Sequence, residues 1–147
     1  LDLAPEEAAA ELQAGRDALR GVASTEILVI EDEPIIALDL RRLVEACGHR
    51  VVGIAATEAD AVRKATAMRP GLILADINLG RGGDGSAAVA RIQSAMDVPV
   101  IFVTAYPERL LTAEGVEPAF VVSKPFEPLA LAIAVYQAVH QGRAPGL

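Results

Sequence analysis

The chain has 147 residues, of which 52% are hydrophobic, and its formal net charge is −7 at pH 7. This length suits one domain with its own core plus a short appendage, and the hydrophobic content excludes a disordered chain. The negative charge argues against nucleic acid as a direct partner, because a surface that binds the phosphate backbone needs a basic stripe.

Residues 1–23 predict a helix that stands apart from the rest of the chain. Pro5 suits the first turn of a helix, and the two glutamates that follow it suit the positive end of the helix dipole. Apolar residues then recur on one face. We interpret this segment as a helical linker or the tail of an upstream domain, followed by the main domain over residues 24–142 and a C-terminal tail over residues 143–147.

Five short apolar runs, rich in valine and isoleucine and without polar alternation, predict buried parallel strands. The runs cover residues 27–30, 51–55, 72–75, 98–103 and 119–122. Such strands alternate with helices when the crossovers between them are right-handed.

Helical spacing fills the gaps between these strands. The predicted helices cover residues 34–47, 58–68, 86–96 and 128–140. Thr57 is a candidate N-cap for the second of them. Residues 105–118 contain two prolines and a glycine, so we expect only a short or irregular helix there. The predicted fold class is therefore α/β: a flavodoxin-like, doubly wound five-stranded parallel sheet with five helices, the fourth short or irregular, preceded by the N-terminal helix.

Neither a membrane span nor an internal disulfide fits this chain. The longest apolar run, residues 129–139, is too short to cross a membrane and is interrupted by Gln137. Cys47 is the only cysteine, which makes a reducing compartment the natural setting. We expect a cytoplasmic protein with no membrane partner.

Polar and charged residues follow the carboxyl ends of the predicted strands. Glu31 and Asp32 follow the first strand, Asp76 the third, Thr104 ends the fourth and Lys124 follows the fifth. Open parallel sheets bind ligands at this edge, near the point where the strand order reverses. In the flavodoxin-like order the first and third strands are neighbours, so three carboxylates should converge.

Converging carboxylates require a cation. Two unit charges ~4 Å apart interact by ~1 kcal/mol in water and by ~4 kcal/mol at an effective dielectric constant of about 20. Oxygen ligands with room for water suit Mg²⁺. We expect Asp32 and Asp76 to bind Mg²⁺ directly, Glu31 to act through water, and Asn78 to offer its backbone carbonyl.

An aspartate in such a site can attack phosphorus to form an acyl phosphate. A bound Mg²⁺ lowers the repulsion between the carboxylate and the incoming phosphoryl oxygens. Asp76 is then the expected phosphoacceptor, with Thr104 and Lys124 holding the phosphoryl oxygens.

The segment DINLGRGGDG raises a competing interpretation, because residues 80–85 satisfy the pattern G-x-G-x-x-G. A dinucleotide-binding loop follows the first strand directly, and an acid ends the next strand. Here the pattern follows the third strand, and the next strand ends in Thr104. We interpret these glycines as a flexible loop beside the acceptor.

Four segments, ILVIEDEP, LILADINL, IFVTAY and VVSKPF, stand in order at the strand ends. With them, residues 27–141 resemble a bacterial response-regulator receiver domain. The resemblance implies five parallel strands and five helices, phosphorylation of Asp76 by a histidine kinase, and reversible hydrolysis of the phosphoryl group. It also implies a cis peptide bond between Lys124 and Pro125.

A narrower resemblance concerns the fourth strand. Phe102-Val103-Thr104-Ala105-Tyr106 is similar to the Phe-x-Thr-Gly-x-Tyr-type signature of one receiver subgroup, with alanine where that subgroup usually has glycine. Ordinary receivers carry an aromatic switch residue three positions before the lysine, where this chain has Val121. The resemblance implies that Thr104 and Tyr106 form the switch.

The same subgroup includes PhyR-type regulators, in which a sigma-factor-like domain precedes the receiver. The first 20 residues are similar to the tail of such a domain. The resemblance implies an anti-anti-sigma regulator of the general stress response: phosphorylation frees the attached sigma-like domain, which then captures an anti-sigma factor of the NepR type.

Three classes of function stay open at this point. The first is a two-component signalling switch that turns over no substrate. A variant of this class is a single-domain receiver that acts in a phosphorelay or competes for kinase. The second is a small aspartyl-phosphate phosphatase, which usually has a second acid two residues after the nucleophile, where this chain has Asn78. The third is a nucleotide-binding module.

Overall fold

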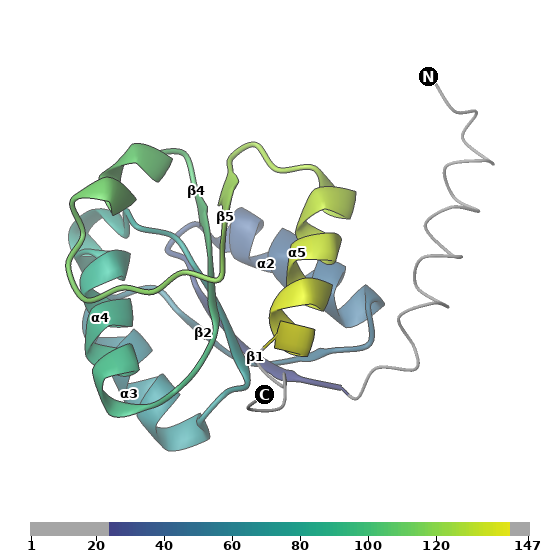
Figure 1. The fold of residues 1–147 in the computed structure, drawn as a ribbon, viewed down its shortest axis with the longest axis horizontal. Helices are drawn as coiled ribbons and strands as arrows, with labels where there is room; N and C mark the ends of the chain where they lie inside the picture. Colours follow the sequence, from purple (N-terminus) through teal and green to yellow (C-terminus); the bar gives the residue numbers. More distant parts are fainter. Residues whose placement is uncertain (1–23, 142–147) are drawn as a thin grey trace.

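A five-stranded parallel sheet lies at the centre of the computed structural model, which describes residues 24–141 (Figure 1). The strands are β1 (Glu26–Ile30), β2 (Arg50–Ala55), β3 (Leu72–Ala75), β4 (Val100–Thr104) and β5 (Phe120–Ser123). Their order in the sheet is β2-β1-β3-β4-β5, and every neighbouring pair is parallel. The predicted fold class and flavodoxin-like order are confirmed.

Four α-helices connect the strands, together with two short 3₁₀ segments. The elements are α2 (Pro34–Ala46), α3 (Glu58–Met68), η1 (Gly80–Gly82), α4 (Gly85–Ala95), η2 (Pro107–Leu111) and α5 (Pro128–Gln141). The predicted short or irregular fourth helix is η2, a 3₁₀ segment that begins at Pro107. The predicted helix over residues 1–23 and the tail over residues 143–147 lie outside the described residues.

The helices cover the sheet in two layers, with α2 and α5 on one face and α3 and α4 on the other (Figure 1). Successive residues of a strand point to opposite faces. In β1, Ile27 and Val29 accordingly pack with α2 and α5, whereas Leu28 and Ile30 pack with α3 and α4. All four are fully buried, which explains why β1 shows no polar alternation. The outer strands β2 and β5 are only partly buried, so the prediction of five buried strands is wrong for these two.

Side-chain caps fix where two of the helices begin. The Thr57 Oγ1 atom accepts a hydrogen bond from the Asp60 backbone N–H at 3.1 Å, which confirms the predicted N-cap of α3. Asp84 caps α4 in the same way, accepting from the Ser86 N–H at 2.8 Å. Helix α3 ends at Met68, and the C-cap residue Arg69 has a left-handed φ of 46°.

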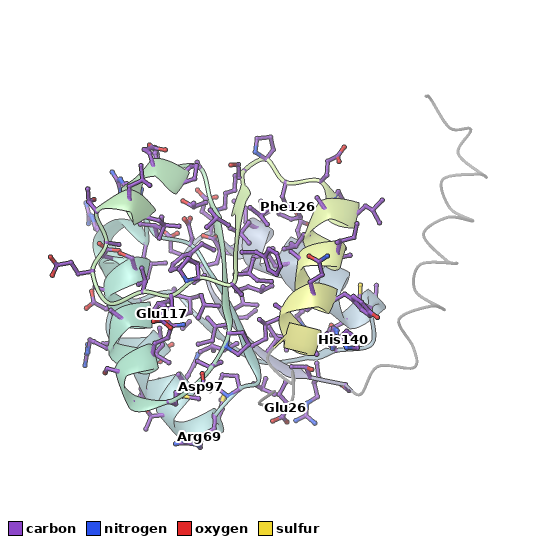
Figure 2. All side chains as sticks on the ribbon, viewed as in Figure 1. Glu26, Arg69, Asp97, Glu117, Phe126 and His140 are labelled. Atoms are coloured by element: carbon purple, nitrogen blue, oxygen red, sulfur yellow. The ribbon has the colours of Figure 1, made fainter. Side chains whose placement is uncertain are left out.

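Because the strands are parallel, all their amino ends lie at one side of the sheet and all their carboxyl ends at the opposite side. Glu26, Arg69 and Asp97, which begin or precede strands, lie at one end of the molecule, and Phe126, which follows β5, lies at the other (Figure 2). Among the described residues, no helix combines the length and apolar character needed to cross a membrane.

Candidate functional site

Three carboxylates meet at the carboxyl ends of β1 and β3. Ile30 and Ala75, the last residues of these strands, are paired in register, so the residues that follow them leave the sheet together. The Asp76 N–H continues the ladder by donating to the Ile30 carbonyl at 2.9 Å. One ligand atom from each of Glu31, Asp32 and Asp76 lies within 4.8 Å of the others. The predicted convergence is therefore present.

Lys124 joins this cluster from the far side of β4. Its Nζ atom lies 2.6 Å from Glu31 Oε1 and 2.8 Å from Asp76 Oδ2. The exposed fractions of the three side chains are only 14%, 1% and 10% respectively. The Lys124 backbone N–H donates to the Thr104 carbonyl at 2.9 Å, and the bond between Lys124 and Pro125 is cis, as the resemblance implied.

Burial and pairing shift the ionisation of this cluster. Burial raises the pKa of Glu31 above its ordinary value, although the hydrogen bond from Lys124 opposes the shift. For Lys124, burial lowers the pKa, but the hydrogen bonds to Asp76 and Glu31 outweigh it and the net shift is upward. Lys124 thus stays protonated at neutral pH and compensates one of the three carboxylates, so the cluster still favours an additional cation.

The donor set suits a hard divalent cation. A polar cavity of about 260 Å³ opens over the carboxylates. It is lined by Asp32, Glu33, Asp76, Asn78, Gly80, Ala105, Tyr106 and Lys124. The available ligand atoms are carboxylate, amide and carbonyl oxygens, which Mg²⁺ prefers to sulfur or imidazole nitrogen. The residues therefore fit Mg²⁺, the cation predicted from the sequence.

Asn78 lines this cavity, and its hydrogen bonds shape the loop to which it belongs. Its backbone N–H donates to Asp76 Oδ1 at 3.3 Å, and its side-chain Oδ1 accepts from the Gly80 N–H at 2.9 Å. The side chain thus shapes the loop that follows the acceptor. That its backbone carbonyl binds the metal stays a prediction.

Two predicted site residues are buried and do not line the cavity. Glu31 and Thr104 are 2% and 0% exposed. The Thr104 Oγ1 atom accepts a hydrogen bond from the Tyr106 N–H at 3.1 Å. Tyr106 is 42% exposed, and its ring centroid lies 4.8 Å from the Arg109 guanidinium carbon. The switch roles of Thr104 and Tyr106 stay predictions.

The structure adds two residues that the sequence reasoning did not assign to the site. Glu33 lines the cavity, and its backbone N–H donates to Glu31 Oε2 at 3.2 Å. Gly80 has a left-handed φ of 57°, and a Cβ atom built on it would lie 3.2 Å from Asp32 Oδ2. The third acid of the segment EDEP was a usable signal for Glu33. No sequence signal placed Gly80 against Asp32.

The glycine-rich segment is closely packed. A Cβ atom on Gly82 would lie 2.5 Å from the Ala56 carbonyl oxygen, and one on Gly83 would lie 2.9 Å from Glu58 Oε2. An isolated antiparallel bridge also joins Asn78 to Asp84. Close approach of the backbone accounts for Gly82, and a left-handed φ of 107° accounts for Gly83. That this loop is flexible stays a prediction. The segment follows β3, which agrees with setting the dinucleotide interpretation aside.

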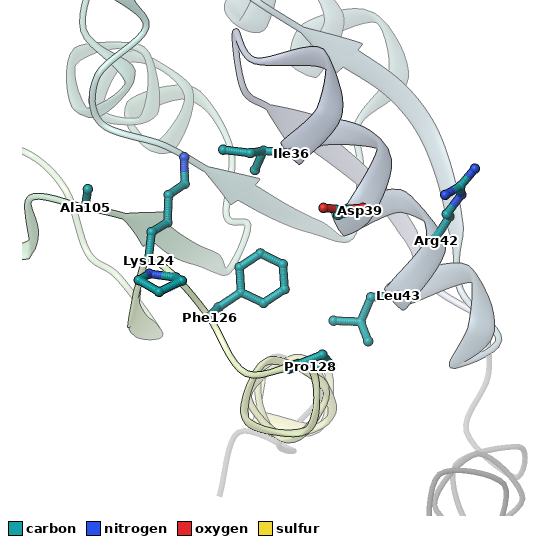
Figure 3. A pocket seen from close by; sticks show the side chains of 9 residues that line it. Ile36, Asp39, Arg42, Leu43, Ala105, Lys124, Phe126 and Pro128 are labelled. Carbon is teal, nitrogen blue, oxygen red and sulfur yellow. The ribbon is translucent and has the colours of Figure 1, made fainter. Parts of the chain in front are cut away.

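An apolar groove of about 780 Å³ adjoins the acidic cavity and shares Ala105 and Lys124 with it. Figure 3 shows Lys124 at one end of this groove and the Phe126 ring between Lys124 and Leu43 in that view. Lys124 thus forms the boundary between an apolar groove and a charged cavity.

Comparison with known proteins agrees with this geometry. Residues 27–136 match the family described as the response regulator receiver domain. The chain is 52% identical over 128 residues to the phyllosphere-induced regulator PhyR of Methylorubrum extorquens, a match that covers 86% of the chain and 48% of that protein. The chain thus spans about half the length of the first curated relatives that it matches.

Solved structures extend the similarity. The NMR structure of the Erythrobacter litoralis PhyR response regulator REC domain has a TM-score of 0.78 and 44% identity, covering 86% of this chain and 98% of that one. The crystal structure of the anti-anti-sigma factor PhyR from Bartonella quintana has a TM-score of 0.75 and 41% identity, covering 94% and 56%. The chain therefore belongs to the response-regulator receiver domain family and is similar to the receivers of PhyR proteins.

Proposed function

We propose that the chain is a phosphorylation-dependent switch of a two-component system, with Asp76 as the phosphoacceptor. The observation that carries this proposal is the position of Lys124 Nζ, 2.8 Å from Asp76 Oδ2 and 2.6 Å from Glu31 Oε1. An ammonium group beside a carboxylate at the floor of a polar cavity is suited to receive the charge of a phosphoryl group. The match to the receiver family supports the same assignment.

In the transfer step, the P–N bond of a kinase phosphohistidine breaks and a P–O bond to an Asp76 carboxylate oxygen forms. The imidazole leaves with the electron pair of the broken bond. Mg²⁺, when bound, neutralises charge between the carboxylate and the phosphoryl oxygens and aligns them. Asp32, Asp76 and the Asn78 carbonyl would hold it directly, and Glu31 through water.

The remaining work falls to the protein's own side chains. Lys124 exchanges its contact with Asp76 for one with a phosphoryl oxygen. The Thr104 hydroxyl, which accepts from the Tyr106 N–H, keeps its own proton to donate to another phosphoryl oxygen. Rearrangement of Thr104 and Tyr106 then carries the signal. Later hydrolysis restores the carboxylate, and no other substrate is turned over.

For the output, we infer that the receiver controls an attached sigma-like domain in the general stress response. Support comes from the relatives, one of which is titled an anti-anti-sigma factor. Support also comes from an apolar surface along β5 and α5 on which Val121, Leu129, Ile133 and Tyr136 are exposed. Phosphorylation would release the sigma-like domain from this surface, and the released domain would sequester an anti-sigma factor of the NepR type.

The acceptor assignment is tested with acetyl phosphate and Mg²⁺, followed by intact-mass measurement. We expect the wild type to gain one phosphoryl group, a chelator to prevent the gain, and Asp76→Asn to show none. Asp97→Asn, which removes an exposed acid before β4, is the matched control and should label normally. Labelling of Asp76→Asn at the wild-type rate would disprove the assignment. Sustained phosphate release would favour the phosphatase alternative.

The output is tested by hydrogen exchange on a chain that carries its upstream domain. Phosphorylation should increase exchange along β5 and α5 and should make the chain bind a NepR-type anti-sigma factor. Unchanged exchange there, without anti-sigma binding, would favour a single-domain receiver that passes phosphate or competes for kinase.

A further inference from the structure

Gly85, the first residue of α4, lies directly against the backbone of the acceptor. A Cβ atom built on Gly85 would overlap the Asp76 carbonyl oxygen and lie 2.9 Å from its carbonyl carbon. It would also lie 3.3 Å from the Cα atom of Ile77. The nearest atoms are all backbone, so no flexible side chain can move aside. Only glycine allows α4 to begin this close to the end of β3.

Backbone conformation does not explain the glycine. The described glycines with a positive φ are Gly48, Gly80, Gly83 and Gly115, and Gly85 is not among them. Gly85 is the first residue of α4, and its backbone is not in the left-handed region that favours glycine. The requirement for glycine at this position therefore comes from close contact with the backbone of Asp76 and, less closely, of Ile77.

Both sides of this contact are anchored. The Gly85 N–H donates to the Ile77 carbonyl at 2.6 Å, and the Asp76 N–H donates to the Ile30 carbonyl at 2.9 Å. Asp84, the preceding residue, accepts from both the backbone N–H and the hydroxyl of Ser86.

The body of α4 is anchored as well, because Ala88, Val89 and Ile92 are buried in the core beneath the sheet. If a methyl group is added at Gly85, α4 cannot move away from Asp76 without opening that core. The displacement must fall at least partly on the Asp76 peptide.

We propose that Gly85 is a positioning residue for the phosphoacceptor. The inference rests on the proposed function of Asp76. Displacing the Asp76 peptide rotates its carboxylate relative to Lys124 Nζ, which lies 2.8 Å away, and relative to Asp32. A misplacement of ~1 Å can slow a reaction by ~10²-fold, because the reacting groups lose their alignment.

The test compares Gly85→Ala with Gly71→Ala. Gly71 precedes the opposite end of the same strand, and a Cβ atom there would lie 2.9 Å from Thr25 Cγ2. Both variants therefore add a methyl group near an end of β3, but only one does so next to Asp76. The readouts are the Mg²⁺ dissociation constant, the maximal rate of labelling by acetyl phosphate at saturating Mg²⁺, and the ¹³C shift of the Asp76 carbonyl, each for the folded fraction.

For Gly85→Ala we expect the maximal labelling rate to fall at least ~10-fold, within the range that misalignment of reacting groups can cost. We also expect weaker Mg²⁺ binding and a moved carbonyl shift. Gly71→Ala should leave all three close to wild type. If the two variants behave alike, or if Gly85→Ala labels as fast as wild type, the proposal is overturned.

Asp84→Ala and Thr57→Ala give a second comparison if Gly85→Ala does not fold. Each removes one helix cap, from α4 and from α3 respectively. The proposal requires Asp84→Ala to slow labelling and to move the Asp76 carbonyl shift more than Thr57→Ala does, and equal effects overturn it. If the wild type itself does not label, the proposed function fails, whereas the carbonyl shift and Mg²⁺ binding still decide the role of Gly85.

Discussion

Two clusters of charged side chains have mirrored compositions and different surroundings. In the first, Lys124 pairs with Glu31 and Asp76, which are 93 and 48 residues away in the sequence. The cluster joins the ends of three strands, and its side chains are almost completely buried.

In the second cluster, one acid pairs with two bases. Asp60 contacts Arg63 and also Lys64, whose Nζ lies 3.0 Å from Asp60 Oδ2. All three residues belong to α3, at spacings of three and four. The Asp60 and Lys64 side chains are 25% exposed, and Arg63 is 74% exposed.

The comparison shows how burial changes what an ion pair does. The ion pairs of the more exposed cluster lie within one helix and exchange easily for water, so each pair contributes little, although Lys64 Nζ also donates to the Ile54 carbonyl of β2 at 2.6 Å. In the buried cluster, removing one member leaves charges without water or partner, which is costly. The buried cluster also retains an excess of negative charge that a cation can use. The candidate site for phosphoryl transfer is therefore the buried cluster, in which charged side chains are costly to bury.

The largest effect is expected from Lys124→Met. This change leaves Glu31 and Asp76 buried without their cation, and we expect the free energy of unfolding to fall by about 3 kcal/mol. Arg63→Met in the exposed cluster should change it by less than about 0.5 kcal/mol. Urea unfolding midpoints measure both. Equal midpoints for the two variants would show that burial does not distinguish the clusters.

A smaller effect is expected from Mg²⁺. At a concentration of ten times its dissociation constant, a ligand that binds only the folded state adds about 1.4 kcal/mol to the free energy of unfolding. The wild type and Asp60→Asn should both show this gain in thermal or urea unfolding. Asp32→Asn should lose most of it. An equal gain in all three would place Mg²⁺ outside the cavity.

A still smaller effect is expected from Asp60→Asn. The hydrogen bond from Lys64 is the largest cause that lowers the pKa of Asp60 below its ordinary value of 3.8. A lowered folded-state pKa stabilises the protein above the ordinary value, and this stabilisation is lost as the pH falls through the folded-state pKa. Asp60→Asn should therefore be less stable than wild type by about 0.5 kcal/mol at pH 7.

The pH dependence provides the check on that prediction. The urea midpoints of Asp60→Asn and wild type should approach each other as the pH is lowered below 3.8. A difference that stays constant from pH 7 into this range would assign the effect to something other than the charge of Asp60.

Local sequence patterns were sufficient for the secondary structure and for the caps. Continuous apolar runs predicted where the strands lie, although β2 and β5, at the sides of the sheet, are only partly buried. Prolines in residues 105–118 predicted the irregular segment that the structure shows as η2. Thr57 was identified as a cap because its partner, Asp60, is three residues away. The acids were found because they follow apolar runs, and their convergence followed from the expected strand order.

The tertiary structure determined the contacts between residues that are far apart in the chain. It places Lys124 Nζ between two carboxylates, turns the Thr104 hydroxyl to the Tyr106 N–H, and seats Gly85 on the Asp76 carbonyl. Sequence spacing specifies which residues share a helix face or end a strand. Contacts across the sheet depend on side-chain conformation and on how closely two backbones approach. For that reason the sequence by itself determined the fold class and the candidate site residues, Lys124 included, whereas the pairing of Lys124 with two carboxylates and the close packing of the glycines emerged only from the folded chain.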